Sequence, residues 1–334
     1  MRAAVLQRFC RPLHVGEVTV PEPQDGEVLV RVRATGLCAT DLKLVSGALS
    51  SVRLPLIPGH EVAGEVVAGD TGLAKGQRVA CYMYEPCGEC RTCLLGHTSV
   101  CPRLVRIGVE RDGGFAEYMR LRRDNALPIP DNVPFAAAAV AMDAVLTPWT
   151  ALRTRARLQA GESVLVVGAG GLGLNAVQIG RGVGARVAVV DPQRTHRERA
   201  QEIGAELAVG PEALDAVRHW SGGGADVALD SSGAVAGFRA ALDGVRRGGR
   251  VACCGYEVGV DYMFESSRVV LEEISILGAR LGTRAEACEV LNAVQQGWIR
   301  PTVMDELPLE GVNAALDRLR SGDVVGRLVI NLNG

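Results

Sequence analysis

Two hydrophobic patterns divide the chain. In the first half, apolar and polar positions alternate in short runs that prolines and glycines separate; these runs fall within residues 1–34, 61–68, 77–82 and 114–121. Alternation with a period of two is typical of antiparallel strands with one exposed face. We therefore predict that the first half is mostly β structure. Alanine-rich, helical sequence begins at residue 135, after three closely spaced prolines.

From Ser163 the pattern changes to short, continuous apolar runs separated by helix-like stretches. Such runs are typical of buried parallel strands. We predict six of them: Val164–Val167, Arg186–Val190, Glu206–Val209, Ala225–Asp230, Arg250–Cys254 and Ile274–Leu281. Strand-helix units of this number suit a doubly wound parallel sheet, so the fold class is α/β. Helices near 285–297 and 310–320 and a closing strand at Arg327–Leu332 are expected to follow.

A glycine-rich motif lies between the first of these strands and its helix. It comprises Gly168, Gly170, Gly171, Leu172 and Gly173, and Asp191 ends the next strand. Glycines allow the backbone to approach a pyrophosphate at the helix N-terminus, and an acid at the second strand accepts hydrogen bonds from ribose. We therefore predict a dinucleotide site that favours NAD over NADP, although Arg194 and Arg197 lie nearby. Asp191 could instead cap a helix that starts at Pro192.

Composition sets the limits of these interpretations. With 334 residues, the chain is longer than a single core usually grows, so two domains are expected. A net charge of −2 gives no reason to expect nucleic acid or membrane partners. Ten cysteines and no recognisable signal peptide point to a reducing cytoplasm, where clustered cysteines bind metal.

Two groups of residues are candidate metal ligands. Cys87, Cys90, Cys93 and Cys101 can close a tetrahedral shell around a structural Zn²⁺, unless they are simply buried or disulfide-paired. Cys38 and His60 are a weaker pair that could be ordinary packed residues. Ahead of a nucleotide motif, they are better interpreted as two of the three protein ligands of an open, reactive zinc.

These motifs together resemble the zinc-dependent medium-chain alcohol dehydrogenase family. The resemblance covers nearly the whole chain and rests on GLCATD (36–41), GHEVAGEV (59–66), the four-cysteine loop, GAGGLG (168–173) and GRLVI (326–330). It implies a GroES-like catalytic domain at 1–144 with a structural zinc loop at 87–101. It also implies a Rossmann NAD-binding domain at 145–284 and a segment at 285–334 that completes the catalytic domain. Family members are typically dimers or tetramers.

The resemblance also implies catalytic roles. Asp143 takes the position of the third catalytic-zinc ligand, where many members have Cys or Glu. Alternatively, Asp143 caps a helix and Glu61 or water completes the shell. Thr40 matches the hydroxyl that relays the alcohol proton, and Asp41 matches the partner that orients His60. Lys43 stands where several members have a relay histidine; because lysine is a poor base near neutrality, we expect it to face solvent or cofactor while protons leave through water.

Further cofactor contacts follow from the same resemblance, although each residue could be scaffold instead. They are Thr147, Gly255, Tyr256, Ala279, Arg280 and Leu281 near the nicotinamide half, and Arg327 near the pyrophosphate. Candidate substrate-pocket residues are Leu49, Met83, Tyr84 and Trp149. Cys10, Cys81, Cys253, Cys254 and Cys288 are expected to be small buried hydrophobes, and His14, His97, His196 and His219 to lie on the surface.

The leading functional hypothesis is a zinc-dependent oxidoreductase that transfers a hydride between a small alcohol, or its aldehyde or ketone, and NAD. One alternative is a zinc-free quinone or enoyl reductase that uses NADPH. Another is an epimerase or lyase that oxidises its substrate transiently with bound NAD. A non-enzymatic binding protein would need neither an open zinc nor a hydride site.

Overall fold

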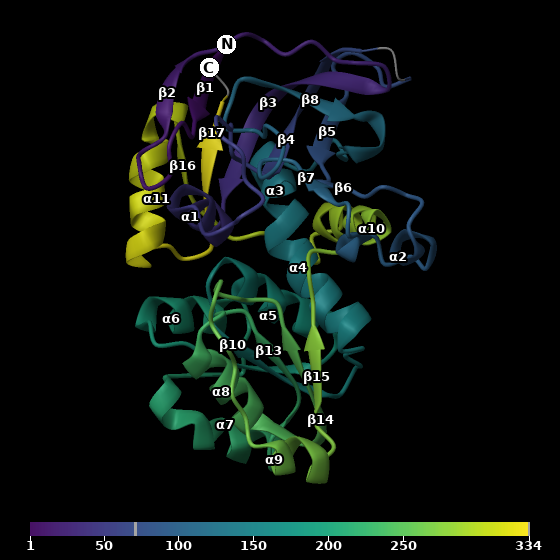
Figure 1. Cartoon of the computed structure of the whole chain (residues 1–334). Helices are drawn as coiled ribbons and strands as arrows, with labels where there is room; N and C mark the ends of the chain where they lie inside the picture. The colour runs from purple at the N-terminus through teal and green to yellow at the C-terminus, as the bar shows by residue number, and fades with distance from the viewer. Residues whose placement is uncertain (70–71, 333–334) are drawn as a thin grey trace. The chain divides into compact units, whose positions relative to one another are not determined.

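The structure is a computed model that describes residues 1–69 and 72–332 (Figure 1). Its contacts divide the chain into two compact units. The first comprises Met1–Asp143, Thr283–Gly297 and Val303–Gly334, and the second comprises Ala144–Gly282 and Trp298–Thr302. Residues 298–302 thus cluster with the second unit. The sequence-based limits at 145 and 285 stay a prediction of where independent domains begin.

The first unit is built on a largely antiparallel sheet, which has seven strands in the described part of the chain. Its order is β16 (Val303–Leu307), β17 (Arg327–Asn331), β3 (Glu27–Leu37), β4 (Glu61–Ala68), β5 (Arg78–Cys81) and β9 (Ala126–Pro128), with β8 (Tyr118–Arg122) also paired to β3. Two small antiparallel pairs accompany it: β1 (Arg2–Val5) with β2 (His14–Glu17), and β6 (Tyr84–Glu85) with β7 (Val105–Arg106). Most strands in the first half of the chain therefore overlap the regions where the alternating pattern predicts them.

Helices of the first unit are short. They are α1 (Ala39–Ser46), α2 (Arg91–Leu94), α3 (Phe135–Val140), α10 (Arg284–Gln295) and α11 (Val312–Ser321). One apolar cluster joins both ends of the sequence, since Leu6, Leu37 and Phe115 pack with Val312 and Leu328. The C-terminal segment is therefore part of the first unit's core.

The second unit contains a parallel sheet with six strands among the described residues. Its order is β12 (Leu207–Val209), β11 (Arg186–Val190), β10 (Ser163–Val167), β13 (Ala225–Asp230), β14 (Val245–Cys253) and β15 (Ser275–Gly278). The helices are α4 (Leu146–Trp149), α5 (Gly171–Val183), α6 (Arg194–Glu202), α7 (Leu214–Ser221), α8 (Val235–Gly244) and α9 (Ser266–Leu271). Strand order reverses at β10, and ligands of such sheets bind beyond the carboxyl ends of the strands at this point. The predicted doubly wound α/β fold is confirmed.

Some predicted boundaries differ from the structure. β8 starts at Tyr118 rather than near residue 114, because Gly113 and Phe115 donate backbone hydrogen bonds to the loop before His60 instead of to a strand. The helix expected after Pro192 starts at Arg194. Helical sequence from 135 is interrupted by two π-helical turns, Ala141–Val145 and Thr150–Arg155.

Two cysteine predictions are wrong, because Cys10 and Cys288 are exposed rather than buried. Cys10 lies in a loop with a positive φ, and Cys288 lies on the outer face of α10. One helical stretch, Phe135–Arg155, has the length and apolar composition of a membrane span, but 78% of its most apolar window is buried inside the protein. Helices in protein cores often have this length and composition, and this stretch packs as a core helix.

Replacing Gly173 with alanine is expected to destabilise the second unit. A Cβ there would lie 1.8 Å from the Gly168 carbonyl oxygen, whereas a Cβ at Gly170 would meet nothing within 4 Å. Overpacking costs about 1–3 kcal/mol. Thermal or urea unfolding without nucleotide should therefore show a loss for G173A and wild-type stability for G170A. Equal stability of the two variants would contradict the packing described here.

Candidate active site and metal centres

Four potential metal ligands converge in the first unit. Atoms of Cys38, His60, Glu61 and Asp143 all lie within 4.8 Å of one another, and all but Asp143 are buried. The Asp143 Oδ2 atom lies 3.4 Å from the Cys38 Sγ and 4.0 Å from the His60 Nε2. Three segments distant in sequence thus place sulfur, nitrogen and oxygen ligands around one point.

Local backbone structure explains how each segment presents its ligand. Cys38 is the N-cap of α1, where its Sγ accepts from the Thr40 N–H while Asp41 accepts from the Cys38 N–H at 2.9 Å. His60 and Glu61 lead into β4, and Glu61 pairs with Gly36 on β3. A Cβ at Gly36 would lie 2.1 Å from the Glu61 Oε2, so only glycine leaves room for this carboxylate. Asp143 lies in the π-helical turn, a feature that often accompanies functional sites.

Asp41 is positioned to orient His60. Its Oδ1 lies 3.5 Å from the His60 Nδ1, and both side chains are fully enclosed. Burial opposes protonation of His60, but Asp41 and Cys38 together outweigh it and raise the imidazole pKa well above its usual range. With Nδ1 facing Asp41, Nε2 is the nitrogen that faces Asp143.

Arg327 adds a permanent positive charge to this cluster. Its Nε donates to the Glu61 Oε1 at 2.9 Å, and its Nη2 lies 3.4 Å from the Asp143 Oδ2. Burial raises the Glu61 pKa to about 8, even though Arg327 acts in the opposite direction. This contact has no signal in the sequence, because the two residues are 266 positions apart.

The donor set fits a zinc ion. Tetrahedral Zn²⁺ with ligands at 2.0–2.3 Å requires about 3.3–3.8 Å between neighbouring ligand atoms. The Cys38–Asp143 separation of 3.4 Å falls in this range, and the His60–Asp143 separation of 4.0 Å is slightly longer. In addition, the Glu61 Oε2 is buried without a hydrogen-bond partner, which is the condition of an acceptor that a cation would satisfy.

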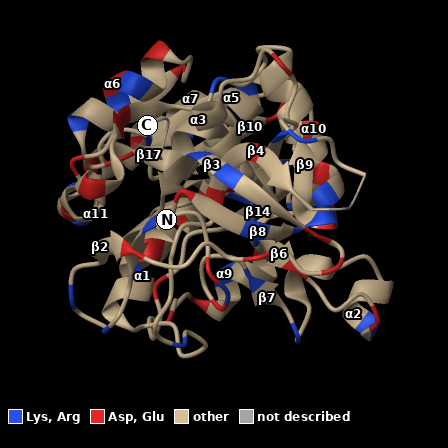
Figure 2. Ribbon diagram, turned by 90° about the horizontal axis from the view of Figure 1, so that it is seen from above, with Lys and Arg blue, Asp and Glu red and all other residues tan. Residues whose placement is uncertain are grey.

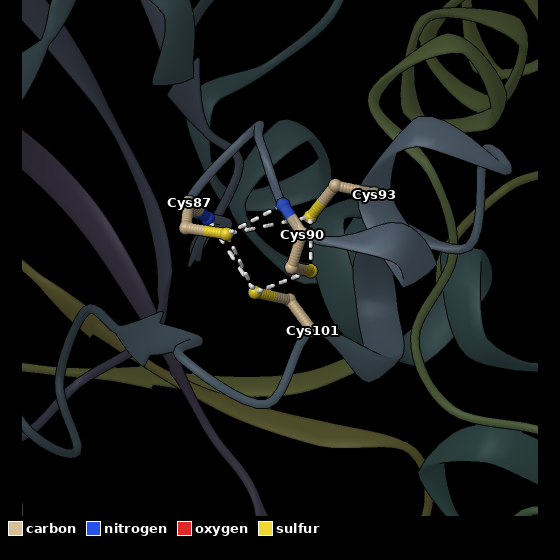
Figure 3. A group of neighbouring side chains, drawn as sticks. All are labelled: Cys87, Cys90, Cys93 and Cys101. Carbon is tan, nitrogen blue, oxygen red and sulfur yellow. Dashed lines mark hydrogen bonds between the residues drawn. The ribbon is translucent and has the colours of Figure 1, made fainter.

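A second cluster lies in the loop around α2, where Cys87, Cys90, Cys93 and Cys101 point toward one another (Figure 3). Four Sγ–Sγ separations among them run from 3.5 to 4.0 Å. A Zn–S length of 2.3 Å requires about 3.8 Å between sulfurs, whereas a disulfide requires about 2.05 Å. The geometry therefore fits a closed metal shell and excludes paired disulfides.

Hydrogen-bond donors surround these sulfurs. The Cys90 N–H donates to the Cys87 Sγ at 3.4 Å, and the Arg103 guanidinium approaches the same sulfur at 3.3 Å. A backbone hydrogen bond from Glu89 is the largest of several that lower the Cys87 pKa to about 6. Such donors favour the thiolate form that binds metal.

Thr40 and Lys43 lie on α1, beside the first cluster. The Thr40 Oγ1 is 3.6 Å from the Cys38 Sγ, so this hydroxyl borders the ligand set. Lys43 is half-buried one turn further along the helix. The roles predicted for both residues stay predictions.

In the second unit, the glycine-rich motif forms the turn from β10 into α5. Gly168 has a φ of +87°, and the Ser231 hydroxyl donates to its carbonyl at 2.7 Å. Ser231 was not predicted from the sequence, and its place after β13 is the one signal that could have indicated it. The turn leaves Gly170 open, as the motif requires for close approach of a pyrophosphate.

Asp191 follows β11 and is almost completely buried. Its Oδ2 accepts from the Ala169 N–H at 2.6 Å, and its Oδ1 accepts from the Gln193 N–H at 2.8 Å. The His196 Nδ1 lies 3.3 Å from Oδ2, so the expectation that His196 lies on the surface is wrong. Burial opposes ionisation of Asp191, but hydrogen bonds from His196, Ala169 and Gln193 outweigh it and lower the carboxyl pKa.

The other predicted cofactor residues lie in the same unit, except Arg327. Thr147 is buried in α4, and Gly255 and Tyr256 follow β14. Ala279, Arg280 and Leu281 follow β15, with Leu281 at a φ of +45°. Trp149 packs edge-on against Trp298 at 5.0 Å, which is the contact of a core residue.

Comparison with known proteins agrees with the ligand clusters of the first unit and with the glycine motif of the second. The alcohol dehydrogenase GroES-like domain model matches residues 24–131, and the zinc-binding dehydrogenase model matches 171–296. An alcohol dehydrogenase from Geobacillus stearothermophilus is 37% identical over the full length of both chains. A solved NAD-dependent alcohol dehydrogenase superposes with a TM-score of 0.94 at 32% identity, covering 99% of each chain. The solved alcohol dehydrogenase from Aeropyrum pernix superposes with a TM-score of 0.92, also at 32% identity. The match covers 99% of this chain and 100% of that chain. The chain therefore belongs to the zinc-type alcohol dehydrogenase family of medium-chain dehydrogenases/reductases.

Proposed function

We propose that this protein is a zinc-dependent oxidoreductase that transfers a hydride between a small alcohol, or the matching carbonyl compound, and NAD. The observation that carries the proposal is the convergence of Cys38, His60 and two carboxylates within 4.8 Å. A zinc-free reductase has no need of such a cluster. The glycine turn with Asp191 supplies the nucleotide half of the reaction.

We infer two zinc ions per chain, one for each ligand cluster. Cys38, His60 and Asp143 would hold the catalytic ion. Glu61 is the alternative third ligand: its Oε1 accepts from Arg327 at 2.9 Å, while its Oε2 has no hydrogen-bond partner. A zinc ion held by three protein ligands acts as a Lewis acid that polarises a carbonyl oxygen and lowers the pKa of an alcohol.

The residues around this cluster would move the substrate proton and hold the ligands in place. Thr40 lies beside Cys38 and would accept a hydrogen bond from the alcohol, then pass the proton outward. Asp41 would keep His60 in the tautomer whose Nε2 lone pair faces the metal position. Arg327 would balance the charge of Glu61 and Asp143, and its contact with the pyrophosphate stays a prediction.

We infer that NAD is preferred over NADP. An ionised Asp191 accepts hydrogen bonds from ribose hydroxyls and repels a 2′-phosphate. Of the two arginines nearby, Arg197 is held by backbone carbonyls, whereas Arg194 is exposed and makes a surface ion pair. Arg194 pairs with Glu198 at 3.1 Å, and the Arg197 guanidinium donates to the Asp191 and Pro192 carbonyls at 2.8 Å. Basic and acidic segments alternate along α6 in Figure 2.

A second copy of the chain is the proposed partner, in a dimer or tetramer. β15 is one of the two edge strands of the parallel sheet, and Ile276 on this strand is exposed. Met263, Val270 and Leu271, on the segment before it, are exposed as well. Unpaired strand edges with apolar flanks are stabilised by pairing with another chain.

A cytoplasmic location is proposed from the ten free cysteines.

Removal of the Asp143 carboxylate should abolish one of the two bound zincs, because the catalytic ion loses a charged ligand. Metal analysis of purified D143A should give about one zinc per chain, against about two for wild type. D131A removes an exposed carboxylate outside both clusters and serves as the matched control with two zincs. Full zinc occupancy in D143A would assign the third ligand to Glu61 or water.

Wild-type enzyme should reduce NAD⁺ in the presence of members of a panel of primary and secondary alcohols, polyols and hydroxyacyl thioesters. With NADP⁺ the rate should fall at least about tenfold, since like-charge contacts cost several kcal/mol. NADH absorbance is the measurement. Reduction of enones by NADPH in zinc-free protein would favour the reductase alternative, and substrate turnover without net NADH would favour an epimerase or lyase.

Substitution of Lys43 by methionine should leave the pH dependence of turnover unchanged. A protonated lysine is a poor base near neutrality, so protons are expected to leave through water. The pH profile of kcat for K43M and wild type is the comparison that decides this. A profile that flattens in K43M would instead identify Lys43 as the base.

A further inference from the structure

A buried histidine contacts the acid of the nucleotide motif. His196 lies on α6, and its side chain is 8% exposed. Its Nδ1 is 3.3 Å from the Asp191 Oδ2. Neither the glycine motif nor the hydrophobic pattern requires a histidine here. Buried polar side chains are hydrogen-bonded, and the partner of this one is the carboxylate of the nucleotide motif.

The hydrogen bonds of Asp191 leave little of its accepting capacity unused. An ionised carboxylate has about four acceptor positions. Ala169 and His196 take two on Oδ2, and Gln193 takes one on Oδ1. The remaining position is therefore on Oδ1. The carboxylate cannot rotate without breaking all three contacts.

We propose that His196 is a positioning residue for the adenosine ribose of NAD. Its Nδ1–H holds the Asp191 Oδ2 against the glycine turn, so that Oδ1 is presented to a ribose hydroxyl. This inference rests on the proposed NAD site. Of the three donors to Asp191, two are backbone amides and one is the His196 side chain. His196 is thus the donor that a substitution can remove directly.

The two ring nitrogens of histidine allow a matched pair of variants. The asparagine amide nitrogen occupies nearly the position of Nδ1, so H196N keeps a donor toward Asp191. The glutamine amide nitrogen lies nearer the position of Nε2, so H196Q keeps a polar side chain but loses that donor. H196L removes all hydrogen bonding at similar volume. Thermal unfolding of each variant without nucleotide reports any general loss of structure.

The experiment measures NADH affinity by fluorescence titration and the KM for NAD⁺ and kcat in steady-state assays. H196Q and H196L are expected to raise the NADH Kd and the NAD⁺ KM about tenfold, the value of a hydrogen bond to a charged group. Their kcat should stay near wild type, because the ribose is remote from the transferred hydride. H196N should bind NADH within about twofold of wild type.

Wild-type affinity in H196Q and H196L would overturn the inference, and so would an H196N variant as weak as H196L. If H196L does not fold, the comparison of H196N with H196Q still decides. These outcomes differ from failure of the proposed function, in which the wild-type protein itself binds no NADH.

Discussion

Buried like charges are the constraint on which the first unit depends. Glu61 and Asp143 lie in the same enclosed cluster with the Cys38 sulfur, and two carboxylates cannot both ionise in such a place without positive charge nearby. Arg327 supplies one cation, through contacts at 2.9 and 3.4 Å. A metal ion would supply the rest. The raised pKa of Glu61 expresses the same deficit, because burial and Asp143 both oppose its ionisation.

This constraint explains why the C-terminal segment returns to the first unit. Arg327 opens β17, and β17 pairs with β3 directly beside the strand end that leads to Cys38. The same strand contributes Leu328 and Ile330 to the core that holds the N-terminal residues. Strand pairing and apolar burial therefore supply the energy that keeps a guanidinium in a buried position, where it would otherwise be costly.

The features that could be predicted from the sequence are those whose chemistry is local. The four cysteines lie within fifteen residues, and their spacing alone predicted a cluster whose sulfurs lie 3.5–4.0 Å apart. The glycine motif and six parallel strands were likewise visible as patterns. Asp143 could be predicted as a ligand only from the family resemblance, because its neighbour in the cluster, Cys38, is 105 residues away. The Glu61–Arg327 pair and the inward orientation of His196 had no periodic or motif signal, since they depend on tertiary packing.

Asp191 shows why a motif residue can have two functions. The acid is normally considered for its effect on ribose, yet its shortest hydrogen bond here, 2.6 Å, is to the Ala169 amide within the glycine turn. It also accepts from Gln193 at the start of α6. One carboxylate thus connects the turn after β10 with the helix after β11. A substitution at Asp191 would therefore alter the shape of the glycine turn as well as the proposed contact with ribose.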